Sequence, residues 1–316
     1  MHVLVTGGTG YLGSAIVRAL ARHGHAPVVF ARHATSASLP GRAVDGDVRD
    51  RTALARAAAG ADAICHAAAL VSVSRPRPAE FDEINVGGLE AILAVAGALG
   101  TPRVVYTSSF LARPPADRTS TICANDYQRT KVRGREVALA AAAAGAPIVS
   151  LVPGVIYGPG KATEGNLVGR LIADHLERRL PGLIGADRPW SYAYVDDVAE
   201  AHVRALEIGR IGQEYLLGGE NTPQMRVFEI VRELTGAPLP RRLPYALATA
   251  AAWFEEARAR LTGHPPQLTR GIVEILRHDW SMDSRRSVDE LGYRITPLAA
   301  GLEALLASFS SFILLP

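Results

Sequence analysis

The chain has 316 residues, of which 48% are hydrophobic and 21% charged, a composition typical of a soluble globular protein with one large domain or a main domain and a smaller one. Its formal net charge is only +3, and arginine pairs such as Arg178-Arg179 form no extended basic tract, so we expect no nucleic-acid partner. No apolar stretch reaches the roughly 20 residues that span a bilayer, and "MHVLV" has no signal-peptide character. We therefore expect no membrane association and a cytoplasmic location.

Cysteine and acidic residues offer little sign of a disulfide or a metal site. The two cysteines, Cys65 and Cys123, provide neither a disulfide framework nor the spacing of metal ligands. Cys65 lies in a buried-strand pattern and is expected in the core. Asp196 and Asp197 stand at a predicted helix start, where carboxylates suit the helix dipole, so we expect them to cap the helix rather than to bind a metal.

The first half of the chain alternates strand-like and helix-like segments. Strands are predicted at 2–6, 26–31, 43–45, 61–68, 103–109 and 146–154, and helices at 10–24, 50–60, 81–99 and 125–144. This alternation predicts an α/β Rossmann-type fold, a doubly wound parallel sheet with crossover helices. We place the dinucleotide-binding domain at residues 1–157.

The second half is less regular. Helical periods at 166–177, 195–208, 225–234, 244–261 and 298–309 are separated by joints rich in Pro and Gly, and one strand is predicted at 214–219. We expect residues 158–316 to form a smaller, mostly helical substrate-binding lobe, with about 195–219 returning to the main sheet.

The first predicted strand runs directly into "TGGTGYLG", with Gly7, Gly10 and Gly13 at the turn and in the first helical residues. Small residues let the chain turn tightly and let the backbone approach a pyrophosphate, for which the helix N-terminus supplies N–H donors. Because a strand precedes the glycines and an amphipathic helix follows them, the pattern predicts a dinucleotide site.

The second predicted strand ends in "VVFARH", where the adenosine ribose of a dinucleotide is expected. NAD sites usually have a carboxylate there for the 2′-hydroxyl, but this chain has Ala31, followed by Arg32. An arginine can bind a 2′-phosphate in bidentate fashion. The sequence therefore favours NADP(H) over NAD(H).

Tyr127 and Lys131 in "NDYQRTK" are four residues apart and share one face of a predicted helix. A tyrosine is a poor acid or base at neutral pH unless its anion is stabilised, and a compact ammonium does this where the planar guanidinium of arginine does not. Lys131 is one of two lysines in a chain with 34 Lys plus Arg. With Ser109, whose hydroxyl can hold a substrate oxygen, these residues predict a catalytic site.

Further motifs follow in a characteristic order: "GDVRD" (46–50), "HAAAL" (66–70), "INVGG" (84–88), "YTSS" (106–109), "VPGVIYGPG" (152–160), "YVDDVAEAH" (194–202) and "DELGY" (289–293). With the glycine turn, they resemble the extended short-chain dehydrogenase/reductase family, which includes NAD(P)-dependent epimerases and dehydratases, over nearly the whole chain. The resemblance implies that Lys131 also holds the nicotinamide ribose, and that Asn85 is a structural or proton-relay residue. It also implies a homodimer through the helices at 81–99 and around Tyr127.

Several residues are expected to contact ligands on the strength of these motifs. The expected cofactor contacts are Gly7, Thr9, Gly10, Tyr11, Leu12, Arg32, Asp47, Val48, Ala67, Ala68, Ala69, Thr107, Tyr127, Lys131, Pro153 and Val155. Ser109, Tyr157, Lys161 and Trp190 are candidates for substrate contacts, although Trp190 could equally wedge the two lobes. His66 is expected to pack rather than to catalyse.

The sequence leaves the reaction open among three possibilities. Epimerases of sugar nucleotides typically carry an arginine on the phosphates where this chain has Trp190, although Arg188 is two residues away. This departure and Arg32 favour an NADP(H)-dependent reductase of a small ketone or aldehyde, resembling the dihydroflavonol reductase-like branch. The alternatives are a nucleotide-sugar 4-epimerase or dehydratase with bound NAD, and a non-catalytic dinucleotide sensor.

Overall fold

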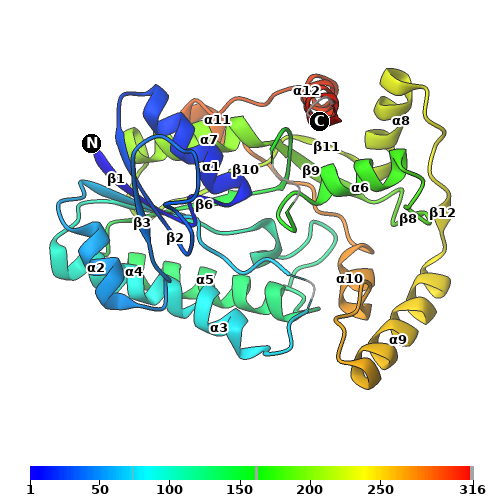
Figure 1. Cartoon of the computed structure of the whole chain (residues 1–316), viewed down its shortest axis with the longest axis horizontal. Coiled ribbons are helices and arrows are strands. Elements are labelled where there is room, and N and C mark those ends of the chain that lie inside the picture. The colour runs from blue at the N-terminus through cyan, green and yellow to red at the C-terminus, as the bar shows by residue number, and fades with distance from the viewer. Residues whose placement is uncertain (73, 161–162, 314–316) are drawn as a thin grey trace.

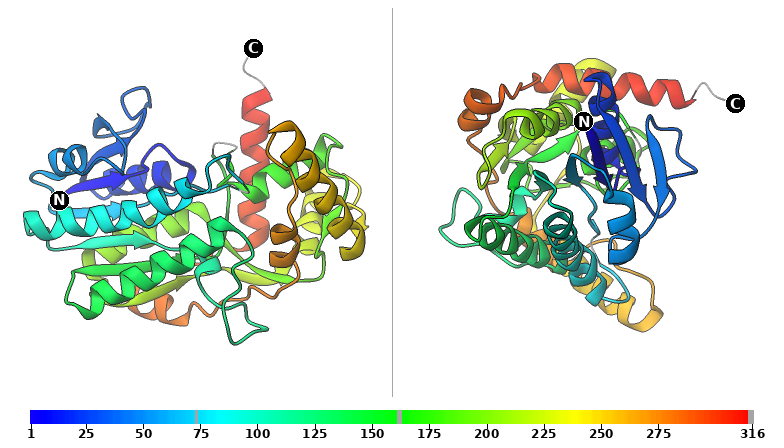
Figure 2. Two further views of the ribbon diagram at one scale, coloured as in Figure 1. Left: turned by 90° about the horizontal axis from the view of Figure 1, so that it is seen from below. Right: turned by 90° about the vertical axis from the view of Figure 1, so that its left-hand side faces the viewer.

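The computed structural model describes residues 1–72, 74–160 and 163–313, the side chains of 310–313 excepted. Its centre is a parallel sheet with helices on both faces (Figures 1 and 2). The strand order is β10-β6-β5-β4-β1-β2-β3. The strands are β1 (His2–Thr6), β2 (Ala26–Ala31), β3 (Arg42–Asp45), β4 (Ala63–His66), β5 (Val104–Thr107), β6 (Ile148–Pro153) and β10 (Glu214–Leu217). The predicted Rossmann-type fold is confirmed.

Two apolar layers hold helices against this sheet. Side chains alternate between its faces, so that along β1 Val3 and Val5 join one core cluster and Leu4 joins the other. One face is covered by α1 (Tyr11–Arg22), α7 (Val195–Ile208) and α11 (Arg285–Leu291). The other is covered by α2 (Arg51–Ala58), α4 (Gly87–Leu99) and α5 (Asp126–Ala143), with α3 (Ala79–Asn85) against α4 and α5.

The order of connections creates a switch point between β1 and β4. The chain leaves β1 through α1 on one face of the sheet and enters β4 through α2 on the other. Open α/β sheets bind their ligands in the crevice at the carboxyl ends of the strands beside such a switch point, so we expect the site at the carboxyl ends of β1 and β4.

The prediction of a single helix at 81–99 is wrong, because the structure has two helices there, α3 and α4, separated at Val86. Gly87 and Gly88 follow this residue, and glycine has low helix propensity. A Cβ on Gly88 would lie 3.2 Å from the Val48 side chain, so the start of α4 passes close to the end of β3. The break also leaves Asn85 as the last residue of α3.

The second lobe contains small sheets that the sequence did not predict. One has the order β11-β9-β7, with β7 parallel and β11 antiparallel to β9, and the other pairs β12 with β8. The strands are β7 (Val155–Tyr157), β8 (Leu183–Ile184), β9 (Pro189–Tyr194), β11 (Glu220–Pro223) and β12 (Arg242–Leu243). Because β7 pairs with β9, this sheet begins three residues before residue 158, where we expected the lobe to start. The helices are α6 (Leu167–Leu176), α8 (Gln224–Thr235), α9 (Tyr245–Thr262), α10 (Arg270–Ile275) and α12 (Leu298–Ile313).

Asp197 connects the two parts of the chain. Its carboxylate accepts hydrogen bonds from the Thr296 backbone N–H at 2.7 Å and hydroxyl at 3.0 Å, just before α12. It lies in the first turn of α7, as expected, but its carboxylate anchors α12 rather than capping α7. Within the described residues, no helix is long and apolar enough to cross a bilayer, and no group of three or more His, Cys, Asp or Glu is placed to hold a metal ion.

Candidate active site

The glycine turn lies at the switch point and has room only for backbone. Gly7 has a φ of +69°, and a Cβ there would lie 2.7 Å from the Ala68 Cα atom. A Cβ on Gly13 would lie 2.1 Å from the Gly7 carbonyl oxygen. The turns after β1 and β4 therefore pack directly together, and the first turn of α1 lies against them.

The start of α1 fits a dinucleotide pyrophosphate. Gly10 is the N-cap residue, and no side chain among the described residues accepts a hydrogen bond at this end of α1. The free N–H groups and the positive end of the helix dipole suit a phosphate group. A Cβ on Gly10 would meet only the Gly7 oxygen within 4 Å, at 3.2 Å, so the backbone is open to a ligand on its other side.

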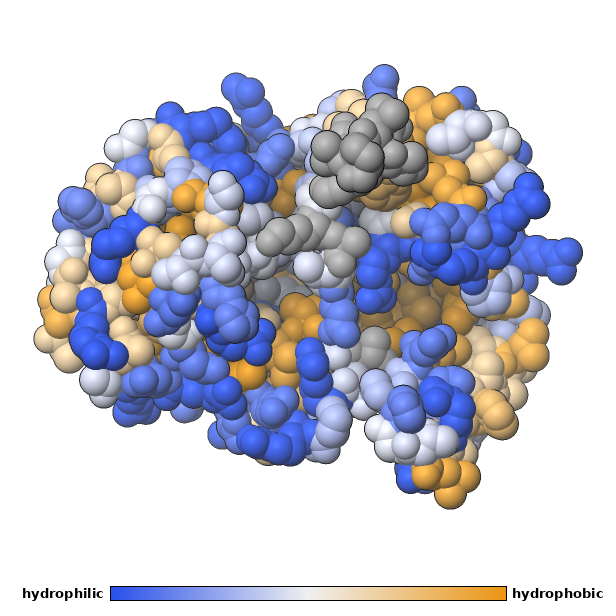
Figure 3. Space-filling model, in the orientation of Figure 1, coloured by the Kyte–Doolittle hydropathy of each residue, from blue (hydrophilic) through white to orange (hydrophobic). Residues whose placement is uncertain are grey.

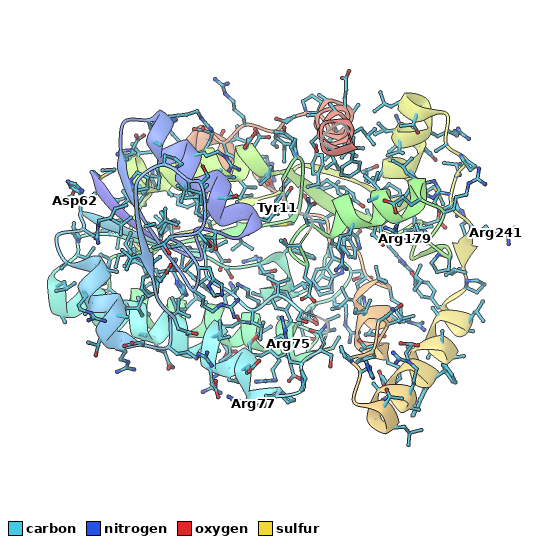
Figure 4. All side chains as sticks on the ribbon, in the orientation of Figure 1. Tyr11, Asp62, Arg75, Arg77, Arg179 and Arg241 are labelled. Atoms are coloured by element: carbon cyan, nitrogen blue, oxygen red, sulfur yellow. The ribbon has the colours of Figure 1, made fainter. Side chains whose placement is uncertain are left out.

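Tyr11 has a structural partner at this turn. Its hydroxyl donates a hydrogen bond of 2.9 Å to the Gly158 carbonyl oxygen, and the residue is buried. Figure 4 shows Tyr11 at the start of α1, near the centre of the molecule. The tyrosine thus connects the first helix with the loop that follows β7. Thr9 lies on the turn itself, and Leu12 packs partly against the core of the α1 face.

The expected adenosine end brings three candidate residues to one edge of the sheet. Arg32 follows β2 and is exposed, while the Asp47 carboxylate accepts hydrogen bonds from Arg49 at 2.8 and 2.9 Å. Arg49, and to a lesser degree Arg32, hold the pKa of Asp47 below its ordinary value. The Arg32 charge is therefore close to Asp47, and Val48 is buried beneath them against α4.

Asn85 holds the loop after β4 against the helix of Tyr127. Its amide oxygen accepts from the Leu70 N–H at 2.7 Å, and its amide nitrogen donates to the Leu70 carbonyl and to the Thr130 hydroxyl. This places the loop that contains Ala67, Ala68 and Ala69 between α1 and α5. Asn85 is 3% exposed, and these contacts favour the structural role over the proton relay.

His66 is a neutral core residue in this arrangement. Its Nδ1 lies 2.7 Å from the Thr6 hydroxyl oxygen, and it is 1% exposed. Burial, together with the positive charge of Lys131, lowers its pKa to about 3. The placement agrees with packing rather than with acid–base chemistry near neutral pH.

Ser109 stands at the end of β5, in extended backbone just before a short 3-10 helix, η1 (Phe110–Ala112). Its hydroxyl oxygen accepts from the Leu111 N–H at 3.2 Å and is also hydrogen-bonded with the Tyr127 phenol. Gln128, which the sequence reasoning missed although it follows Tyr127 directly, donates to the Leu111 carbonyl at 3.3 Å and accepts from the Ala124 N–H at 3.0 Å. The glutamine therefore holds the segment from Ser109 to Ala112, here called the serine turn, against the start of α5.

Tyr127 lies in the first turn of α5, which Asn125 caps by accepting from the Gln128 N–H. We expected Lys131 to lower the pKa of this phenol. In the structure burial raises it to about 12, and the hydrogen bond with Ser109 only partly offsets this effect. The phenol is therefore protonated at neutral pH, which is the form that a proton donor requires.

Lys131 is a buried cation with few partners. It is 4% exposed, its Nζ donates to the Thr107 carbonyl at 3.3 Å, and it lies 5.8 and 5.9 Å from the ring centroids of Tyr106 and Tyr127. Burial lowers its pKa to about 8. The ammonium and the phenol thus share one face of α5, as their spacing predicts.

His202 of α7 is hydrogen-bonded to the Thr107 hydroxyl. The sequence did not predict this contact, although His202 is the last residue of the motif at 194–202. Its Nδ1 lies 2.7 Å from the Val198 carbonyl, an acceptor, so this nitrogen carries the proton. Its Nε2, 2.9 Å from the Thr107 hydroxyl oxygen, therefore accepts from that hydroxyl. Burial lowers the pKa of His202 to about 4, so the pair keeps this polarity at neutral pH.

Glu214 of β10 joins the serine turn to α5 by ion pairs. Its carboxylate accepts from Arg135 of α5 at 2.7 Å and also pairs with Arg113, the residue after η1. Nothing in the local sequence around Glu214 indicates this contact, because the pairing depends on the return of β10 to the main sheet.

The substrate candidates occupy different places. Tyr157 is fully buried and packs edge-on against Tyr192 and Tyr194, and a Cβ on Gly301 of α12 would lie 2.3 Å from its hydroxyl oxygen. This interior position does not favour the expected substrate contact. Lys161 lies outside the described residues.

Trp190 is also an interior residue, and it faces the serine turn. It is 4% exposed, and its ring centroid lies 5.9 Å from that of Phe110, the residue after Ser109. Val155 belongs to the same apolar cluster, whereas Pro153 is the last residue of β6. Arg188 is exposed, so its side chain does not replace an arginine at the buried position of Trp190.

Comparisons with known proteins agree with this geometry. Residues 3–218 match the model of the NAD dependent epimerase/dehydratase family. The chain is 31% identical to the sterol demethylase protein B of Methylococcus capsulatus (98% of each chain) and 30% identical to the 2-alkyl-3-oxoalkanoate reductase of Stenotrophomonas maltophilia (93% and 94%). It is also 29% identical to the UDP-glucose 4-epimerase of Corynebacterium glutamicum (87% and 94%). The chain therefore belongs to the NAD dependent epimerase/dehydratase family, within the extended short-chain dehydrogenases/reductases, and is an NAD(P)-dependent enzyme.

Proposed function

We propose that this enzyme is an NADPH-dependent reductase of a ketone or aldehyde. The observation that carries the proposal is the buried, uncharged position of Trp190, because a nucleotide diphosphate needs cations where this chain has an indole. The exposed Arg32 at the end of β2 and the similarity to a 3-oxoalkanoate reductase support it. The similarity to a UDP-glucose 4-epimerase makes epimerisation the competing possibility.

The residues at the crevice would divide the reaction as follows. The turn at Gly7 and Gly10 and the start of α1 would hold the pyrophosphate, and Lys131 would hold the nicotinamide ribose. When bound, NADPH supplies the hydride that the carbonyl carbon accepts. Ser109 donates a hydrogen bond to the carbonyl oxygen, and the Tyr127 phenol transfers its proton to that oxygen. The product is an alcohol, and the tyrosinate regains a proton from solvent.

The reaction class is tested by oxidation of NADPH, followed at 340 nm, with a panel of aliphatic and aromatic ketones and aldehydes. The expected result is stoichiometric formation of alcohol and NADP+. UDP-glucose and dTDP-glucose are supplied in parallel, without added cofactor. Conversion of either sugar nucleotide by enzyme purified with bound NAD+ would show that the reductase proposal is wrong.

Arg32 is expected to set the preference for NADPH. Replacing it in Arg32→Asp removes the cation and adds a carboxylate, so we expect the KM for NADPH to rise roughly tenfold or more while that for NADH falls or stays unchanged. Steady-state kinetics with both cofactors measure this. The control is Arg56→Asp on the exposed side of α2, which changes the charge equally and should leave both KM values unaltered. An unchanged KM for NADPH in Arg32→Asp would contradict this role.

We also propose a homodimer in which α4 and α5 of two copies form a four-helix interface. The exposed residues of the two helices include the small or apolar Ala94 and Leu139, beside the charged Glu90, Arg133 and Glu136. Light scattering should give about twice the 33.5 kDa of one chain for the wild type and the monomer mass for Ala94→Arg. A monomeric wild-type protein would contradict the interface.

A further inference from the structure

The four most exposed large apolar side chains among the described residues all belong to α9. They are Leu247, Trp253, Phe254 and Leu261, which are 59%, 54%, 70% and 88% exposed. In Figure 3 hydrophobic residues follow the outer edge of the molecule at the lower right, where Figure 1 places α9. Single exposed apolar residues are ordinary on a protein surface, whereas a group of them on one element indicates a surface that another molecule covers.

The exposed side of α9 forms a continuous apolar stripe. The stripe consists of Leu247, Ala250, Phe254, Ala257 and Leu261, all of them exposed. At 3.6 residues per turn these five positions fall within about 80° around the helix axis and extend over about 21 Å, and no charged residue of α9 falls within that arc. The opposite face is also apolar, because Ala248 and Ala252 pack against Val273 of α10. Both sides of α9 are therefore apolar, although the described part of the chain covers only one.

Arginines flank the stripe and make this part of the surface positive. Residues 241–270 contain five arginines and two glutamates, so their formal net charge of +3 (5 − 2) equals that of the whole chain. Both glutamates are neutralised in ion pairs, which join Glu255 with Arg258 and Glu256 with Arg270. The Arg241 and Arg260 side chains are exposed and form no ion pair or hydrogen bond with any described residue. Figure 4 shows Arg241 at the outer edge of the molecule, beside β12.

Trp253 lies beside the stripe, next to Phe254 in the sequence. The Arg270 guanidinium lies 3.8 Å from the centroid of its ring system, so the indole has a cation on one side and an apolar surface on the other. Tryptophan, leucine and phenylalanine next to arginines are typical of a helix that lies in the surface of a membrane. The apolar side chains of such a helix enter the acyl boundary, and its cations bind anionic headgroups.

We infer that α9 is a docking surface for an anionic lipid membrane, on which the helix lies with its stripe towards the acyl chains. Our expectation of no membrane association rested on spanning segments and a signal peptide, and a helix in the membrane surface needs neither. A second copy of the chain fits this surface less well, because it would bring the same excess of positive charge to the interface. The inference concerns where the enzyme works and does not depend on the proposed reductase function.

Co-sedimentation of the full chain with lipid vesicles tests this surface. The vesicles contain phosphatidylcholine alone or with about 30% of the anionic phosphatidylglycerol. We expect the anionic vesicles to bind roughly fivefold more strongly or better, and added salt to weaken the binding. The double variant Phe254→Ser/Leu261→Ser changes only exposed side chains and should lower the partition coefficient for anionic vesicles roughly tenfold or more. Arg260→Glu should lower it roughly fivefold or more.

Matched controls replace exposed residues of the main domain. Ile208→Ser/Ile211→Ser removes two exposed apolar side chains at the end of α7 and just after it, and Arg56→Glu reverses an exposed charge on α2. Both controls should bind anionic vesicles as the wild type does.

The fluorescence of Trp253 reports docking directly, because the other two tryptophans, Trp190 and Trp280, are buried. Emission from the wild type should shift to shorter wavelength on anionic vesicles, and this shift should be absent in Trp253→Phe.

Three results would overturn the docking surface: no binding of the wild type to anionic vesicles, equal binding to vesicles without anionic lipid, or unchanged binding in both α9 variants. A loss of binding in the controls as large as in the α9 variants would also overturn it. A smaller mass of Phe254→Ser/Leu261→Ser than of the wild type in lipid-free buffer, measured by light scattering, would mean that a second copy covers the stripe instead.

Discussion

Replacing Tyr127 by phenylalanine is expected to lower kcat for ketone reduction by about 10²- to 10⁴-fold, the usual contribution of a positioned general acid. The ring keeps its place on α5 against the apolar cluster, so KM should change little. Only the hydroxyl that is hydrogen-bonded with Ser109 is lost. Steady-state kinetics with NADPH and a reducible ketone measure the effect.

Fluorescence titration with NADPH provides the control for this variant, because cofactor affinity should stay within about twofold of the wild type if folding is intact. The stability should also be similar, since the phenol lies at a partly buried position. Turnover near the wild-type level in Tyr127→Phe would mean that another group donates the proton.

Lys131→Met is expected to abolish turnover and, at the same time, to make the protein more stable without cofactor. In the wild type the pKa of Lys131 falls from 10.5 to about 8 because the ammonium is buried with a single hydrogen bond at 3.3 Å. A shift of this size corresponds to on the order of 3 kcal/mol against the charged form at pH 7. Methionine has a similar shape and no charge, so the free energy of unfolding should rise by roughly 1–3 kcal/mol.

The contribution of Lys131 to the stability of the folded protein should increase as the pH rises. Because the folded-state pKa of Lys131 lies below the unfolded value, the unfolded chain binds more protons between pH 8 and 10.5. Stability from this group is therefore lowest below pH 8 and recovers as the pH rises through that window. The difference in Tm between wild type and Lys131→Met should accordingly shrink as the pH rises from 7 to 10.

Differential scanning fluorimetry across that range measures the effect, with Arg133→Met as the control. Arg133 is an exposed cation on the same helix, so its loss should change Tm by less than a degree or two. If Lys131→Met is less stable than the wild type at pH 7, burial of the Lys131 ammonium does not destabilise the folded protein. Loss of the Lys131 charge above pH 8 should also lower kcat/KM in alkaline solution.

Local patterns predicted most of the main domain. The strands at 2–6 and 26–31 agree with β1 and β2, because their apolar runs are bounded by glycine or polar residues and are buried on both faces. The glycine turn could also be predicted, because the small residues that let its backbone turn tightly lie within a few positions of each other in the sequence. Its neighbours across the turn, Ala67 and Ala68, are small as well. Tyr127 and Lys131 lie together because a helix brings residues four apart onto one face.

The sequence could not predict what depends on distant contacts. The motif at 152–160 makes Tyr157 a candidate for a substrate contact, yet α12 places Gly301 directly over its hydroxyl. Glu214 supports the serine turn only because β10 lies beside β6. The short strands β7, β9 and β11 have no clear alternation, and they exist because Trp190 and Tyr192 are enclosed between α6, α8 and α12.

The return of β10 to the sheet has a consequence for how this protein is made. β6 is buried along its whole length and pairs with β5 on one side and β10 on the other, while α7 covers the α1 face. A nascent chain that has emerged only to residue 157 therefore presents β6 as an unpaired apolar edge, a form that invites association with other chains. The main sheet cannot be completed until the ribosome has released residue 217, which follows α6, β8 and β9 of the second lobe. A fragment that ends at residue 157 is thus expected to aggregate on expression, although it contains the glycine turn, Ser109, Tyr127 and Lys131.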